Sequence, residues 1–227
     1  EGTLTYVQGG SVTGCQADEI KSQTEEIAPQ DLPIATSTID SWKQDAASGG
    51  TISGDYVVPN GQTRDLGPKK IEGKLILENN STLNITGTIW VVASTTVNNN
   101  ATLRLDSDSY GELSGVLISD DLVKIRPGAI LQGSGDKNSY LMLLSTSSSL
   151  DENYPAIDVD NNTDAAIFYA SSGLILLHNN INAKEVTGYK IFLDNNAKIS
   201  YESGLTDAQF TSGPAGTWMV ASWKEIE

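Results

Sequence analysis

The sequence has one cysteine, one histidine and few basic residues, and each scarcity counts against a class of protein. Cys15 has no partner for an intrachain disulfide, so the fold does not depend on one. His178 is the only histidine, and its place beside a turn predicts an exposed corner residue rather than a catalytic or metal-binding group. The 14 Lys and Arg residues are outnumbered by 29 Asp and Glu, which disfavours nucleic acids and other polyanions as partners.

Long apolar runs are also missing. No window holds the ~18 apolar residues that would span a bilayer, so this segment is not expected to insert into a membrane. The first residues, "EGTLTYVQGG", lack the basic and apolar regions of a signal peptide. The chain is therefore expected to be either cytosolic or the processed outer part of a longer protein.

What the sequence does contain is a recurring unit, a short aliphatic run followed by two asparagines. "LILENNSTLNI" recurs twenty residues later as "TTVNNNATLRL", and "IDVDNN", "ILLHNN" and "IFLDNN" follow. Aligning the units on the second asparagine gives one anchor position in each: Asn80, Asn100, Gly128, Asn162, Asn180 and Asn196. Because Gly and Asn are the residues that most readily adopt positive φ, their exchange predicts a left-handed turn at this position. An incomplete earlier unit reads Val57, Asn60, Gly61.

The spacing of the units predicts the fold class. Apolar and polar residues alternate before each anchor, as in Leu75 and Leu77, which is the pattern of a strand with one buried face. The shortest steps between anchors are 16, 18 and 20 residues, and longer steps contain insertions. Strand and turn repeated at this period predict an all-β parallel β-helix (solenoid), with right-handed crossovers. Stacked anchor asparagines are expected to hydrogen-bond to one another as a ladder along the axis.

The two ends of the chain are expected to protect the solenoid. Residues 1–50 are predicted to form an N-terminal segment with a capping helix, and residues 51–227 the solenoid. "IATSTIDSWKQDAASGG" has Ser37 or Thr38 as N-cap candidates, Gly49 after its end, and Ile39, Trp42 and Ala46 on one face. We expect this helix to cap the first rung. The C-terminal "GTWMVASWKEIE" is expected to close the last rung or to run back along the outside.

Candidate sites are few. "SDD" (residues 119–121) and "NTD" (residues 162–164) imitate motifs of pectin-degrading glycosidases, but the order is reversed and the accompanying histidine and "Arg-Ile-Lys" run are missing. Asp158 and Asp160 project to one side of a strand, where calcium could bind weakly. Two insertions, at roughly 106–114 and 145–156, contain Tyr110 and Tyr154, the candidates for ligand contact.

Several segments together resemble a known group of proteins. They are "STIDSWKQDAASGGTISG", "LGPKKIEGKLILENNSTLNITGTIWV", "YLMLLSTSSS" and "GYKIFLDNNAKISYESGL", and the resemblance covers residues 31–227. They are similar to the C-terminal β-solenoid of bacterial cell-surface proteins that have a pilin-like N-terminus. The resemblance implies a secreted, membrane- or pilus-anchored protein whose hydrophobic N-terminal helix is missing from this sequence, and it carries no catalytic residues.

Three functions remain open. The leading one is a non-enzymatic extracellular surface or pilus-associated adhesion module, monomeric as an isolated domain, that displays loops and binds polysaccharide or pilus subunits without a cofactor. The second is a self-assembling filament like those of bactofilins, disfavoured by the predicted caps. The third is a polysaccharide-acting enzyme, disfavoured because no paired acid and base is evident.

Overall fold

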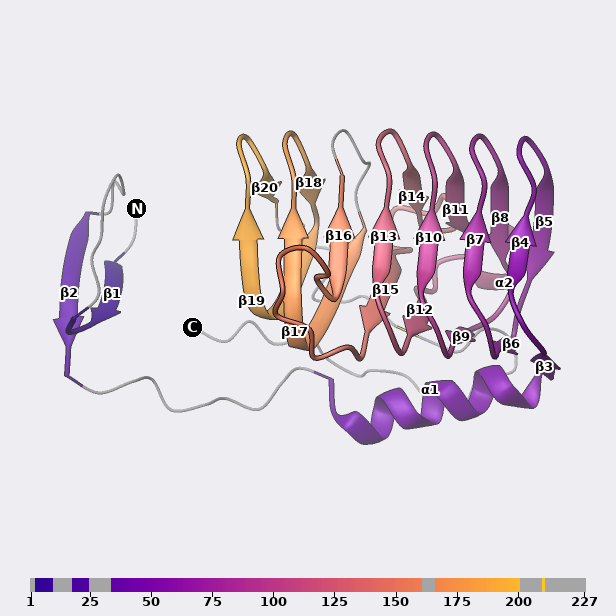
Figure 1. The fold of residues 1–227 in the computed structure, drawn as a ribbon, viewed down its shortest axis with the longest axis horizontal. Coiled ribbons are helices and arrows are strands. Elements are labelled where there is room, and N and C mark those ends of the chain that lie inside the picture. Colours follow the sequence, from indigo (N-terminus) through magenta and orange to yellow (C-terminus); the bar gives the residue numbers. More distant parts are fainter. Residues whose placement is uncertain (1–2, 10–17, 25–33, 161–165, 201–209, 211–227) are drawn as a thin grey trace. The chain divides into compact units, whose positions relative to one another are not determined.

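The computed structural model describes residues 3–9, 18–24, 34–160, 166–200 and 210, which fall into two separate units (Figure 1). The smaller unit consists of β1 (Thr3–Val7) and β2 (Glu19–Gln23). These strands pair in parallel, with Thr3 opposite Glu19, and most of β2 is exposed. The larger unit begins before Ile34, so it contains the helix α1 (Thr36–Ser48) as well as the solenoid.

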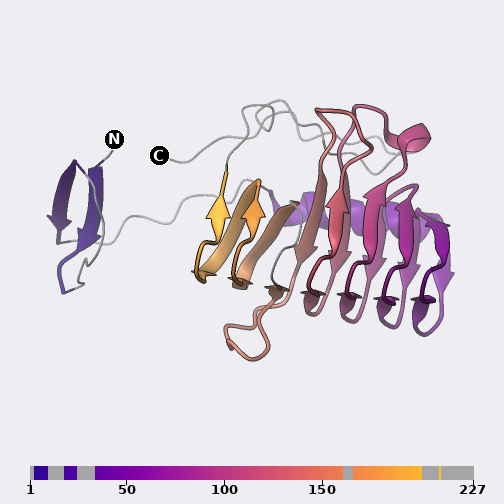
Figure 2. The ribbon, with the colours of Figure 1, turned by 90° about the horizontal axis from the view of Figure 1, so that it is seen from above.

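The larger unit is an all-β parallel solenoid whose described strands belong to seven turns (Figures 1 and 2). We name its three sides by their strands. The helix face contains β3 (Thr51–Ile52), β6 (Lys69–Ile71), β9 (Ile89–Val91), β12 (Gly115–Ser119) and β15 (Leu141–Ser145). The loop face contains β4 (Tyr56–Val58), β7 (Leu75–Leu77), β10 (Thr95–Val97), β13 (Val123–Ile125) and β16 (Ile157–Val159). The polar face contains β5 (Thr63–Leu66), β8 (Thr82–Ile85), β11 (Thr102–Leu105) and β14 (Ile130–Gln132).

The last two turns use longer strands. β17 (Ile167–Leu177) and β19 (Glu185–Leu193) each run through the helix face and the loop face, which joins these faces into one 12-stranded sheet. β18 (Asn182–Ala183) and β20 (Lys198–Ile199) form a separate short parallel pair. Every strand pair among the described residues is parallel, which confirms the predicted fold class. The hand of the solenoid stays a prediction.

The predicted register of the repeat is confirmed from the second turn to the sixth. Leu75 pairs with Thr95, Thr95 with Val123, Val123 with Ile157 and Ile157 with Ile175. All of these side chains are buried, since alternation along each short strand directs every second residue inward. Burying one Leu, Ile or Val contributes roughly 1.5–3 kcal/mol, so the stacked aliphatic columns supply most of the stabilisation of this unit.

The anchor residues form the corner between the loop face and the polar face. Asn80, Asn100, Asn180 and Asn196 have φ between 56° and 60°, and Gly128 has φ 73°, as the Asn–Gly exchange predicted. Asn162 lies outside the described residues. In the first turn the anchor is Gly61, at φ 68°, which shifts the proposed unit by one position. Val58 is consequently buried there, whereas Val57 points outward.

The corner is connected from turn to turn mainly by the backbone. The amide N–H of Asn80 donates to the carbonyl of Asn99 over 3.1 Å, and that of Asn180 donates to Asn195 over 3.2 Å. Among the described anchors, one side-chain bond of the expected ladder is present, from Asn196 Nδ2 to Asn180 Oδ1 at 3.4 Å. The asparagines are therefore selected chiefly for their left-handed backbone and only locally for a ladder.

The helix predicted from the sequence is α1, and it buries the side that the sequence predicted. Ile39 and Ala46 are buried and Trp42 is fully enclosed. The N-cap position is Ala35 instead of Ser37 or Thr38, and it has no side-chain cap. Gly49 has ordinary helical φ, while the left-handed residue after the helix is Gly50, at φ 105°.

The expected position of α1 as a cap on the first rung is wrong. The helix lies lengthwise beside the stacked strands and packs on the outside of the helix face (Figure 1). Its backbone lies closest to β6 and β9, and its buried side chains share an apolar cluster with outward-pointing side chains of β12, β15 and β17: Val116, Ile118, Met142, Leu144, Ile167 and Tyr169. The physical reason is that β12 and β15 are apolar on both sides, with every residue buried, so their outer surface needs a cover.

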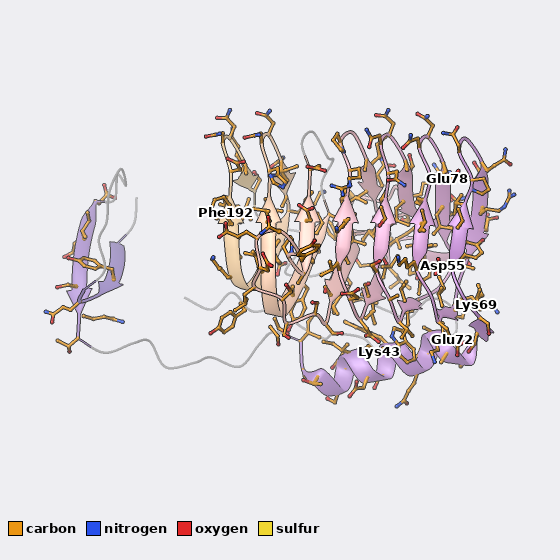
Figure 3. All side chains as sticks on the ribbon, in the orientation of Figure 1. Lys43, Asp55, Lys69, Glu72, Glu78 and Phe192 are labelled. Atoms are coloured by element: carbon orange, nitrogen blue, oxygen red, sulfur yellow. The ribbon has the colours of Figure 1, made fainter. Side chains whose placement is uncertain are left out.

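Polar contacts fix α1 in this position. Lys43 Nζ lies 2.6 Å from Asp120 Oδ1, and Trp90 Nε1 donates to Asp120 Oδ2 over 2.8 Å. Lys70 Nζ lies 4.8 Å from the centre of the Trp90 ring, so this ring carries a cation on its face. Figure 3 shows Lys43 projecting from the helix.

The ends of the solenoid differ in chemistry. In the first turn Arg64 occupies the position that is an inward leucine in the next turns, and it is exposed. In the last turn Ile191, Phe192, Leu193 and Ile199 are 38–46% exposed within the described residues (Figure 3 labels Phe192). The C-terminal "GTWMVASWKEIE" lies outside the described residues.

Candidate ligand-binding groove

The outer side of the polar face presents a column of polar side chains in register. Asp65 pairs with Asn84, Asn84 with Arg104, and Arg104 with Gln132. Because the residues between them point inward, these four side chains share the outer surface of four successive turns. Thr63, Thr82 and Thr102 form a second column beside them. We call these seven residues the polar strip.

Hydrogen bonds order the polar strip along the solenoid axis. Arg104 Nε donates to Asn84 Oδ1 over 2.8 Å, and Asn84 Nδ2 donates to Asp65 Oδ1 over 2.6 Å. A guanidinium has five N–H donors, so the bond to Asn84 orients the Arg104 side chain and uses only one of them. The strip is therefore an ordered surface with both donors and acceptors.

A short helix and a loop rise beside the strip. α2 (Ser107–Tyr110) is capped by Asp106, whose Oδ2 accepts from the Ser109 backbone N–H over 2.9 Å and from its hydroxyl over 2.7 Å. The loop 133–140 is tied to the segment after α2, because the Ser134 hydroxyl donates to Gly111 O and the Ser139 hydroxyl to Leu113 O. These bonds build a wall on one side of the polar strip.

Two adjacent hollows lie between the strip and this wall. One has a volume of about 190 Å³ and is lined by Asn84, Arg104, Leu105, Asp106, Ser107, Gln132, Gly133, Ser134 and Gly135. The other has about 290 Å³ and is lined by Leu131, Gln132, Gly133, Gly135, Asp136, Ser139, Tyr140, Leu141, Ala166 and Lys184. Because they share Gln132, Gly133 and Gly135, we treat them as one site, the polar groove.

The chemistry of the polar groove suits hydrogen bonding more than catalysis. Its two carboxylates already have structural partners, since Asp106 caps α2 and Asp136 Oδ1 accepts from the Asn138 N–H over 2.8 Å. The remaining polar side chains are amides, hydroxyls and two cations, with the Lys184 ammonium 4.9 Å from the centre of the Tyr140 ring. Such a mixture of donors and acceptors matches a ligand rich in hydroxyl groups.

The two tyrosines that were predicted from the sequence as ligand contacts differ in exposure. Tyr110 is 2% exposed, so its proposed role in ligand contact is wrong. Its ring packs over Gly115, where a Cβ would lie 2.7 Å from Tyr110 Cε1. Tyr154 is 60% exposed on the loop 146–156, and the Lys124 ammonium lies 5.8 Å from its ring centre.

The candidate calcium residues have other partners. Ile157 and Val159 are buried, so Asp158 and Asp160 face outward as expected. Arg126 Nη1 lies 2.9 Å from Asp160 Oδ2 and 3.8 Å from Asp158 Oδ2, while His178 Nε2 lies 3.1 Å from Asp158 Oδ1. The described residues contain no cluster of three or more Asp, Glu, His or Cys side chains able to hold a metal. Calcium binding at this pair stays a prediction, and the ion would have to displace Arg126.

Of the two fragments that imitate glycosidase motifs, the structure describes only "SDD". Asp120, in "SDD", is bonded to Lys43, Trp90 and the Thr146 hydroxyl, so it serves to hold α1. Asp164, in "NTD", and Cys15 lie outside the described residues.

Sequence reasoning did not identify the residues of the polar groove. Asn84 and Arg104 stand at outward positions of the same twenty-residue alignment that placed the core, so reading its polar positions would have found the column. Asp106, Ser107 and Ser134 had no such signal, because the insertion and loop that contain them meet only in three dimensions.

Comparisons with known proteins leave the family open. No protein-family model matches the chain, and neither the curated proteins nor the solved structures include a match. Neither helix in the described part of the chain combines the length and apolar character needed to cross a bilayer.

Proposed function

We propose that the protein is a non-enzymatic surface module that binds polysaccharide in the polar groove. The observation that carries the proposal is the joining of an ordered polar strip to two hollows of about 190 and 290 Å³ on a rigid solenoid. Rigid β scaffolds hold side chains in place before the ligand arrives, which lowers the entropic cost of binding.

The cellular setting belongs to the same proposal. The resemblance to pilin-linked surface proteins supports an extracellular location, anchored at the cell surface or in a pilus. There the loop 146–156, with exposed Tyr154, is a second contact surface for a polysaccharide or a pilus subunit. The loop is held in place, since the Leu174 N–H donates to Ser149 O over 2.8 Å and Lys190 Nζ lies 3.2 Å from Glu152 Oε1.

The test is a binding measurement with matched arginine variants. Soluble cello-, xylo-, manno- and chito-oligosaccharides are titrated into the full chain and followed by calorimetry. Arg104→Ala removes the central donor of the groove, whereas Arg64→Ala removes an arginine of the same face whose guanidinium bonds to its own neighbour Thr63 O. We expect at least one series to bind, with affinity lost in Arg104→Ala and retained in Arg64→Ala. Equal affinities in both variants, or no binding by any series, would refute the groove as the site.

A filament is the second candidate, because the last turn exposes Ile191, Leu193 and Ile199 within the described residues. Head-to-tail stacking would place Arg64 of the next copy over this apolar end. Burying the charge of a guanidinium is costly, and inward-pointing charges are a known defence of sheet edges. Light scattering over a concentration series distinguishes the candidates, since the surface module is expected to stay monomeric and a filament to grow.

A further inference from the structure

We infer that the ligand of the polar groove is a neutral, linear, β-linked polysaccharide that lies along the solenoid axis and contacts one turn with each sugar unit. This inference rests on the proposed function and specifies its substrate class and binding geometry. The observations that carry it are the spacing of the polar strip, the direction in which the wall leaves it open, and the charge around it.

The spacing comes from the backbone. Asp65, Asn84, Arg104 and Gln132 are direct partners in adjacent parallel strands, which lie ≈ 4.7–4.9 Å apart. The column therefore advances by roughly 5 Å per turn and spans roughly 14 Å over its three steps. This advance is close to that of one pyranose unit in an extended β-linked chain, so each successive sugar meets one polar side chain of the column.

The direction comes from the wall formed by α2 and the loop 133–140. A polysaccharide that followed the strands would run from Thr102 past Arg104 and meet the wall at Asp106 and Ser107. A chain that followed the axis would cross Gln132, Arg104, Asn84 and Asp65 in order, with the wall beside its start. The hydrogen bonds that link Arg104, Asn84 and Asp65 run in this same direction, so they preorganise the donors and acceptors along the chain.

The preference for a neutral ligand follows from the charges on and around the groove. The chain has a formal net charge of -15, and Asp65, Asp106 and Asp136 lie on the strip or line the groove. A polyuronate would be repelled by this field, whereas a neutral chain is unaffected by it. One bond of Arg104 is also committed to Asn84, so this guanidinium orients amide and hydroxyl partners and does not form an isolated anion site.

The experiment is a length series on the full chain. Cello-, xylo-, manno- and chito-oligosaccharides of two to six units are titrated, beside oligogalacturonides of the same lengths. In the series that binds, affinity is expected to rise about two- to tenfold per added unit, the effect of one net hydrogen bond, and to level off near four units. Oligogalacturonides are expected to bind more weakly at every length.

A variant at the far end of the strip separates this inference from the proposed function. Asp65→Ala should weaken the binding of four-unit ligands much more than that of two-unit ligands, because Asp65 lies three turns from Gln132 and lines neither hollow. Arg104→Ala should weaken both. Binding that does not depend on length, with Asp65→Ala like the wild type, would overturn the axial geometry while leaving the groove as the site. Tighter binding of oligogalacturonides would overturn the neutral class, and no binding at all would refute the proposed function itself.

Discussion

The left-handed corner at Asn80 permits a quantitative test of why the chain repeats asparagine. Asn80 has φ 57°, is exposed, and has no side-chain hydrogen bond to another described residue. A non-glycine residue in this region costs roughly 1–2 kcal/mol, and a β-branched side chain is the least suited to it. We therefore expect Asn80→Val to lower the free energy of unfolding by about 2 kcal/mol. For a unit of this size that corresponds to a fall of about 4–8 °C in Tm.

Two further variants isolate the contribution of the left-handed backbone conformation to the free energy of unfolding. Asn80→Gly accepts the same φ without strain, so its loss should stay within about 1 kcal/mol, the entropy that glycine adds to the unfolded chain. Asn79→Val places the same side chain one residue earlier, where φ is negative, and should change stability by about 0.5 kcal/mol or less. Urea unfolding gives the three values from the transition midpoints at constant slope. If Asn79→Val and Asn80→Val lose the same stability, the left-handed corner is not the reason for asparagine.

Three other predictions follow from the packing and the site. Asp120→Asn should lower the free energy of unfolding by roughly 1 kcal/mol, because it removes the charge partner of Lys43 in a partly exposed pair, and an unchanged urea midpoint would contradict this role. Gly87→Ala should cost about 1–3 kcal/mol, because its Cβ would lie 2.6 Å from Pro68 N in the adjacent turn. Gly61→Ala has open space around its Cβ and only φ strain, so it should cost about 1 kcal/mol. Equal losses of stability in Gly87→Ala and Gly61→Ala would argue against close packing between adjacent turns at Gly87. No reducing sugar should be released from cellulose, xylan, pectin or chitin, and sustained turnover would refute the non-enzymatic assignment.

The core could be predicted from sequence because its signals are local and repeated. Alternation before each anchor identifies the inward residues, and the Asn or Gly at the anchor sets the register, so Leu75, Thr95 and Val123 could be aligned without a structure. The first turn was displaced by one residue because its anchor is Gly61 and the adjacent Asn60 offered an equally good choice. Where two residues that both favour turns stand together, the pattern alone does not choose between them.

The position of α1 and the groove needed information from distant segments. An amphipathic helix shows which side it buries, here Trp42 and its neighbours, and says nothing of the surface that receives it. A signal existed in the partner, because "GVLIS" and "LMLLS" are unbroken by the polar residues that an exposed strand face would have. The groove combines residues from Asn84 to Lys184, so no short stretch of sequence contains it.

Tyr110 and Tyr169 form a matched pair in which the same substitution should have opposite effects. The hydroxyl of Tyr110 is buried without a hydrogen-bond partner among the described residues, whereas that of Tyr169 donates to the Ile34 carbonyl over 3.1 Å. Tyr110→Phe should therefore stabilise the protein by about 1 kcal/mol or more, and Tyr169→Phe should destabilise it by about 1 kcal/mol.

The same pair predicts the response to alkaline pH. Desolvation by burial raises the pKa of both hydroxyls above the ordinary value near 10, so the unfolded chain loses these protons first. Stability is then fully present below about pH 10 and falls as the pH rises through the folded pKa. Urea midpoints at pH 8 and pH 10.5 measure this fall, which should be smaller in Tyr110→Phe than in the wild type. The reasoning would be refuted if Tyr110→Phe were less stable than the wild type and lost as much stability between pH 8 and pH 10.5. That result would show that the buried hydroxyl has a hydrogen-bond partner, and that more than apolar contacts hold the Tyr110 ring in place.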